Sequence, residues 1–146
     1  MKTITRLVSS LFLCTAAAGI AVAQQVDRVT AGGWIHSTLT ASRATFGIVA
    51  RNTTPLTGQV TVVDHNSVLG GVLHSTSITS YTIVNPTTRT ITGTCTINGI
   101  SGFTFTVTLV DNGEPGTADT FTISVSTGYN ASGTLGGGNV RVHPVP

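Results

Sequence analysis

Apolar and polar residues alternate along most of this chain from Trp34 onward. Residues 103–109 (FTFTVTL) carry an apolar side chain at every second position with threonine between, and 120–125 (TFTISV) and 90–97 (TITGTCTI) repeat the pattern. A period of two is typical of a β-strand with one buried face, and β-branched residues suit such strands. No stretch shows a convincing helical period. We therefore predict half-buried antiparallel strands with threonine-rich outer faces.

Clusters of Asn, Asp, Gly and Pro separate the alternating segments, and Asn98-Gly99 is the sharpest of them. That pair fits a type I′ turn, in which both central residues need a positive φ. Many short strands with frequent turns predict an all-β fold, either a single antiparallel β-sandwich or a closed β-barrel. We expect about nine strands, the last interrupted at Gly136–Gly138, near residues 33–38, 44–51, 58–64, 68–76, 78–84, 88–97, 102–110, 119–127 and 129–142.

Residues 1–23 have the features of a secretory signal peptide. Lys2 and Arg6 precede an apolar stretch, and Ala21-Val22-Ala23 matches a small-residue cleavage site. The apolar run is shorter than the ~20 residues needed to span a bilayer. We expect cleavage near Ala23, secretion without membrane insertion, a short lead-in over residues 24–31 and one β domain over residues 32–143.

Charge is scarce and balanced. Only 8% of residues are charged, and removal of Lys2 and Arg6 from the seven basic residues leaves five scattered arginines against five acids. A chain with zero net charge and no basic patch lacks the electrostatic footprint of a nucleic-acid-binding or lipid-binding protein. We expect no nucleic-acid partner.

Cys95 would be the one cysteine left after cleavage, because Cys14 belongs to the leader. It follows the alternation of residues 90–97, which places it on the inward face. With no basic neighbour in the sequence to favour the thiolate, we predict a buried, inert thiol.

An acidic segment, residues 111–119 (DNGEPGTAD), lies between two predicted strands. Its oxygen donors Asp111, Asn112, Glu114 and Asp119 could hold calcium. The alternative, which we favour, is a turn whose carboxylates accept hydrogen bonds from local backbone amides. We therefore expect no cofactor, with calcium as the one ion that the sequence suggests.

The four histidines, His36, His65, His74 and His143, lack the short spacing of a zinc site. A small secreted hydrolase could pair His74 or His65 with an acid such as Asp119 or Asp64. No G-x-S-x-G elbow or phosphate-binding loop accompanies them.

Large amphipathic aromatic side chains are few. Trp34, Tyr81 and Tyr129 are candidates for stacking on sugar rings, with His74 beside them as a polar binding residue. The alternative places each aromatic in the core or at its rim.

Several phrases, taken in order, resemble the post-COAP-1 domain, an extracellular bacterial module. They are residues 44–47 (ATFG), 74–77 (HSTS), 92–94 (TGT), 97–99 (ING), 119–121 (DTF) and 135–143 (LGGGNVRVH). The resemblance spans about residues 32–143. It implies a secreted, β-rich accessory module and carries over no catalytic residues.

The sequence thus supports one main function and two alternatives. The main one is a secreted non-catalytic binding or structural module of the bacterial surface or extracellular matrix, with a polysaccharide or another surface protein as partner. The alternatives are the small hydrolase and an extracellular protein that self-assembles into oligomers through uncharged edge strands.

Overall fold

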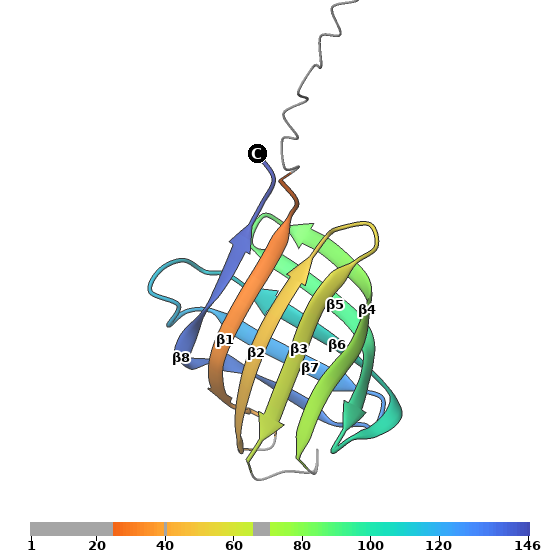
Figure 1. Cartoon of the computed structure of the whole chain (residues 1–146). Helices are drawn as coiled ribbons and strands as arrows, with labels where there is room; N and C mark the ends of the chain where they lie inside the picture. The colour runs from red at the N-terminus through yellow and green to blue at the C-terminus, as the bar shows by residue number, and fades with distance from the viewer. Residues whose placement is uncertain (1–24, 40, 66–70) are drawn as a thin grey trace, which may run out of the picture.

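A computed structural model describes residues 25–39, 41–65 and 71–146 and shows a closed β-barrel (Figure 1). The expected leader, residues 1–23, and the first residues of the strand expected at 68–76 lie outside this description. The eight strands are β1 (Arg28–His36), β2 (Arg43–Arg51), β3 (Thr57–Asp64), β4 (Val72–Asn85), β5 (Thr88–Ile97), β6 (Ile100–Val110), β7 (Thr120–Val125) and β8 (Asn130–His143).

Each strand pairs antiparallel with its sequence neighbours, and β8 returns to pair with β1. The all-β antiparallel prediction is confirmed, and the barrel is the alternative that the chain adopts. The described residues contain no helix long and apolar enough to cross a membrane.

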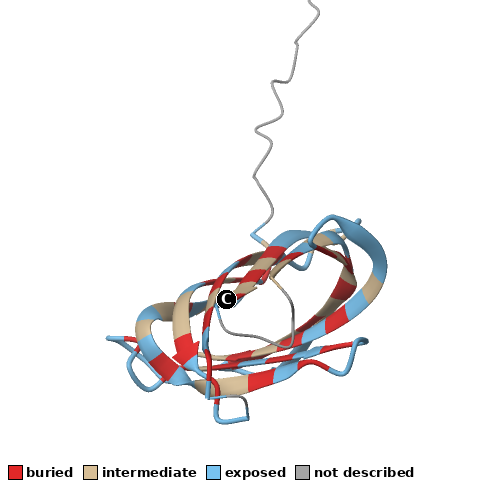
Figure 2. Cartoon of the chain, turned by 90° about the horizontal axis from the view of Figure 1, so that it is seen from below, coloured by how far each residue is buried: buried red, intermediate tan, exposed pale blue. Residues whose placement is uncertain are grey.

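Alternation along the strands fills the barrel with apolar side chains, and buried residues, drawn in red in Figure 2, recur along the strands. In β5 every second residue from Arg89 to Ile97 is buried, and Cys95 is among them, as predicted. Phe46 and Phe121 stack across the interior with ring centroids 4.1 Å apart. Burying a side chain of this kind contributes about 1.5–3 kcal/mol, so the filled interior is the main source of stability.

The hairpin predicted at Asn98-Gly99 is confirmed. Asn98 and Gly99 have φ values of 49° and 80° and join β5 to β6. Positive φ at both central residues is what a type I′ turn requires.

Three predicted boundaries were wrong. The strands expected at 68–76 and 78–84 are one strand, because β4 absorbs its extra residues as register shifts against β5, between Ser75 and Ser77 and between Ile78 and Ser80. β8 is not broken at Gly136–Gly138, although its register against β1 shifts at Gly136. β1 begins at Arg28, inside the segment expected to be a lead-in.

Candidate functional site

The barrel end where β1 begins and β8 ends carries a hollow of about 590 Å³. We call this end of the barrel the terminal end. Residues before β1 and after β8 line one side, and the end of β4 with the start of β5 lines the other. Val26, Ile83 and Val145 make the lining largely apolar. Barrel mouths are common places for binding sites, so this hollow is the first candidate.

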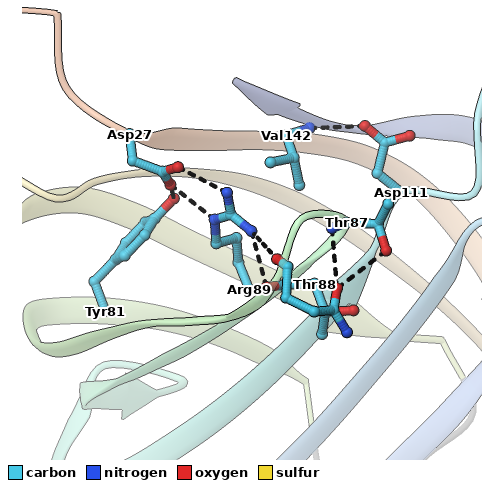
Figure 3. A network of polar contacts seen from close by, with 8 residues as sticks. Asp27, Tyr81, Thr87, Thr88, Arg89, Asp111 and Val142 are labelled. Carbon is cyan, nitrogen blue, oxygen red and sulfur yellow. Dashed lines mark hydrogen bonds and ion pairs between the residues drawn. The ribbon is translucent and has the colours of Figure 1, made fainter. Parts of the chain in front are cut away.

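Two of the lining residues, Asp27 and Arg89, form a buried ion pair (Figure 3). Arg89 donates from Nε to Asp27 Oδ1 and from Nη2 to Asp27 Oδ2, both at 2.7 Å, and the two residues are 1% and 5% exposed. Tyr81 donates its hydroxyl proton to Asp27 Oδ1 at 2.5 Å. Arg89 Nη1 donates to the carbonyl oxygens of Asn85 and Thr88. The network joins the segment before β1 to the β4–β5 hairpin.

The charges in this network neutralise each other. Burial raises the pKa of Asp27, but the hydrogen bonds from Arg89 and Tyr81 and the charge of Arg89 outweigh it, so the pKa lies below its ordinary value. The hydrogen bond to Asp27 outweighs burial at Arg89 and raises its pKa. Burial and the hydrogen bond to Asp27 raise the pKa of Tyr81. The three pKa shifts keep Asp27 as a carboxylate, Arg89 as a guanidinium and Tyr81 as a neutral phenol. None of the three groups is shifted toward titration near neutral pH, so the network is structural rather than reactive.

A second carboxylate and tyrosine pair lies at the opposite end, where β3 ends and β8 begins. Asp64 is 4% exposed and accepts hydrogen bonds from the Tyr129 hydroxyl at 2.6 Å and from the Ser42 hydroxyl at 2.8 Å. Burial and the hydrogen bond to Asp64 raise the pKa of Tyr129. Each end of the barrel is therefore held by an acid bonded to a tyrosine.

The acidic segment 111–119 lies against β8 beyond the point where β7 stops pairing with it. Asp119 is fully buried and accepts hydrogen bonds from the backbone amides of Asn112 and Val140. Asp111 accepts from the amides of Gly113 and Val142 (Figure 3). The bonds to Asn112 and Gly113 are the local ones that the turn alternative predicts. Those to Val140 and Val142 go further, because there the carboxylates take the place of a neighbouring strand along the edge of β8.

Glu114 is the exposed acid of that segment. It accepts a hydrogen bond from Arg141 at 2.8 Å and one from the Asn139 amide. Within the described ranges, His, Cys, Asp and Glu side chains form no group of three or more that could hold a metal ion.

The four candidate binding residues do not come together. Tyr129 is buried at one end, and Tyr81 is tied to Asp27 at the other. Trp34 lies on the outer face, where a methyl group on Gly136 would overlap its ring and the Arg43 guanidinium carbon lies 4.4 Å from the ring centroid. His74 is exposed, and its ring contacts the Thr61 hydroxyl.

The outer surface over β1, β2 and β3 carries two shallow hollows that share Ile48, and neither Trp34 nor His74 lines them. Each hollow lies at one of two paired glycines, where no side chain fills the surface. The hollow at Gly32 of β1 has a volume of about 340 Å³, and the hollow at Gly47, on the side toward β3, has a volume of about 310 Å³. Threonine hydroxyls border both. Arg43 lies over the ring of Trp34, so the cation occupies the face that a sugar ring would stack on.

The acid–histidine pairs considered for a hydrolase are separated or engaged elsewhere. His74 pairs with Thr96 near the opposite end, whereas Asp119 precedes β7 at the terminal end. His65 is exposed and contacts the Thr45 hydroxyl, while the adjacent Asp64 is buried with Tyr129. Thr30 contacts the ring of His143, and Trp34 contacts that of His36.

Sequence reasoning missed Arg89 and Asp27. The alternation of β5 could have revealed Arg89. It lies an even number of positions from Ile91 and Cys95, so its side chain is on the same, inward face of the strand. An inward arginine needs an acid partner. The identity of that partner, 62 residues away in the chain, had no such signal.

Comparisons with protein-family models, with curated proteins and with solved structures find no match to this chain.

Proposed function

We propose that this protein is a secreted, non-catalytic binding or structural module of the bacterial surface or extracellular matrix. The leader-like residues 1–23 and the resemblance to the post-COAP-1 domain support the compartment. The non-catalytic part of the proposal rests on one observation, which is that the acidic side chains are engaged in structural hydrogen bonds. All five acids of residues 25–146 accept hydrogen bonds from arginine, asparagine, tyrosine, serine or backbone amides.

The terminal-end hollow is the surface that best suits such a role. Its lining is largely apolar, and two of the lining residues form an ion pair whose charges cancel. A surface of this kind favours an uncharged partner, such as a neutral polysaccharide or an apolar patch of a surface protein. Calcium, if it binds, would have to displace the amides that Asp111 and Asp119 now hold.

The test is retention of the exported protein on insoluble polysaccharides and on intact bacterial surfaces, beside an activity panel of esters, glycosides and peptides. Val145 lines the hollow and is half exposed, so Val145→Lys should weaken retention at least tenfold. Ile100→Lys is the control, because Ile100 is more exposed and lies at the opposite end. Turnover of a substrate, or equal retention of the two variants, would contradict the proposal.

A further inference from the structure

One stretch of strand edge stays unpaired although the barrel closes. β3 and β4 pair only at Thr61–His74, Val62–Leu73 and Val63–Val72. The ladder then ends, and the Ser75 hydroxyl accepts the amide proton of Val60 at 2.8 Å. Beyond this point β4 bends away from β3 over the terminal end (Figure 1).

We call residues 76–85 of β4 the free edge. Among the described residues, these backbone groups form a ladder with β5 alone, so the side of the strand that faces away from β5 has no strand neighbour. Unpaired amides and carbonyls along an extended strand are a template for another strand.

The alternation of buried and exposed residues ends along the free edge. The last four residues, Thr82 to Asn85, are all exposed, so both faces of the strand meet solvent there. Two of them are aliphatic, with Ile83 50% and Val84 56% exposed. Adjacent exposed apolar residues on an unpaired edge are typical of an interface.

Charge and symmetry indicate what covers this edge. Residues 76–85 (TSITSYTIVN) carry no acid, base or histidine, so two antiparallel copies place no like charges opposite each other. An antiparallel pair about a two-fold axis matches each free donor with the equivalent acceptor of the other copy. The five arginines and five acids of residues 25–146 also leave little long-range repulsion between copies.

The hydroxyls of the free edge are hydrogen-bonded within the barrel, so pairing with a second copy rests on the backbone groups. Neighbouring strands of the barrel already join through hydroxyls, as Thr76 and Ser77 do with Thr94 at 2.7 and 2.8 Å and Thr90 does with Thr108 at 3.1 Å. Cross-strand threonine pairs stabilise sheets.

We propose that the protein forms a two-fold dimer in which the free edges of two β4 strands pair antiparallel and join the barrels into one continuous sheet. This inference goes beyond the proposed function and does not depend on it.

Analytical ultracentrifugation of protein expressed from the full-length sequence tests the proposal. The wild type should convert from monomer to dimer as its concentration rises. Ile83→Lys/Val84→Lys should shift the dissociation constant at least tenfold toward monomer, because it replaces the two exposed aliphatic side chains of the free edge with charged ones that pairing would have to desolvate. Ile100→Lys/Ser101→Lys is the matched control on an equally exposed hairpin and should dimerise like the wild type.

Cysteine cross-linking provides a second measurement should the lysine variants fold poorly. In a scan of single cysteines along the free edge, only those next to the two-fold axis should form intermolecular disulfides under mild oxidation, with Ile100→Cys as the negative control. Buried Cys95 keeps the background low. A wild type that stays monomeric at all soluble concentrations, a dimer indifferent to the lysines at 83 and 84, or open-ended assemblies would each overturn the proposal. Ile83 also lines the terminal-end hollow, so the retention test uses Val145→Lys, which lies outside the free edge, at concentrations where the protein is monomeric. The two proposals then fail separately.

Discussion

Two buried acids, one near each end of the barrel, show how single residues give this sparsely charged molecule its defined structure. Asp27 binds Arg89 and Tyr81, and Asp64 binds Tyr129 and Ser42. A buried charge is costly unless it is paired and hydrogen-bonded, so each acid constrains its neighbours closely. The acids therefore position chain segments rather than substrates.

Arg89→Met should lower the free energy of unfolding by about 3–5 kcal/mol, because it leaves Asp27 buried without its counter-ion. Chemical denaturation measures the loss. Arg141→Met is the control, since Arg141 and Glu114 are 57% and 52% exposed. An exposed pair of this kind contributes about 0–1 kcal/mol, and similar losses in the two variants would contradict a buried role for Arg89.

Asp27 should also make the protein sensitive to acid. Its pKa lies below the ordinary value of 3.8, so its contribution to stability is present above that pH and is lost as the pH falls through the lowered pKa. Asp27→Asn should be less stable than the wild type at neutral pH, and the difference should shrink below pH 3.8. A difference that stays constant down to acid unfolding would show that Asp27 is not the titrating group.

At the scale of elements, glycines decide where strands approach each other closely. Gly136 lies in β8 beneath the ring of Trp34, where a side chain has no room. Gly47 lies on the same outer face, and a methyl group there would meet no atom within 4 Å. Substitution of Gly136 therefore measures the cost of crowding Trp34, and substitution of Gly47 measures the effect of replacing a glycine where there is no crowding.

Gly136→Ala should displace the indole and shift its fluorescence, and it should cost on the order of 1–3 kcal/mol through overpacking. Trp34 is the only tryptophan of the chain, so the signal is unambiguous. Gly47→Ala should leave both the spectrum and the stability nearly unchanged. An unshifted spectrum in Gly136→Ala would mean that the indole does not rest on β8.

The acidic segment supports a further prediction for this edge of the sheet. Asp119→Ala should destabilise the protein by several kcal/mol, because it leaves the amides of Asn112 and Val140 without their acceptor. Glu114→Ala should have a small effect, since Glu114 is exposed.

Calorimetry of the wild type with calcium and with chelator should give one melting temperature. A rise of the melting temperature with calcium would favour an ion site in the acidic segment instead.

Alternation predicted the faces of the strands well, because burial of every second side chain is a local property of the sequence. The turn at Asn98-Gly99 was equally local. Which strands pair was harder to predict from the sequence. Arg28 of β1 pairs with His143 of β8, more than 100 residues away, and the pairing of these two strands closes the sheet into a barrel. The bulges that merge two predicted strands into β4 depend on β5, and Gly136–Gly138 continues as a strand because β1 lies beside it.

The candidate site was harder to predict than the fold. Parity shows that Arg89 faces inward, but its partner Asp27 precedes the first strand and follows no pattern. The turn-like acids Asp111 and Asp119 were correctly expected to hold backbone amides. That two of those amides belong to β8 could not be foreseen, because it depends on where β7 stops.

At the scale of the whole molecule, the barrel has a filled interior and two ends held by buried polar bonds. Partners must then meet its outer surfaces, of which the terminal-end hollow and the free edge of β4 are the most distinctive. The central claim is that the polar groups at both ends are structural. It requires that Tyr81 and Tyr129 stay bonded to their acids as long as the protein is folded.

A spectrophotometric titration of the two tyrosines, followed together with circular dichroism, tests that claim most directly. Both pKa values are raised by burial and by the bonds to Asp27 and Asp64, so the folded state should keep both phenols neutral above their ordinary pKa of 10. Stability should then fall as the pH rises past 10, and phenolate absorbance should appear only with unfolding. Ionisation of either tyrosine near pH 10 in a protein that keeps its β-sheet spectrum would show that the end concerned is open, and the claim would be wrong.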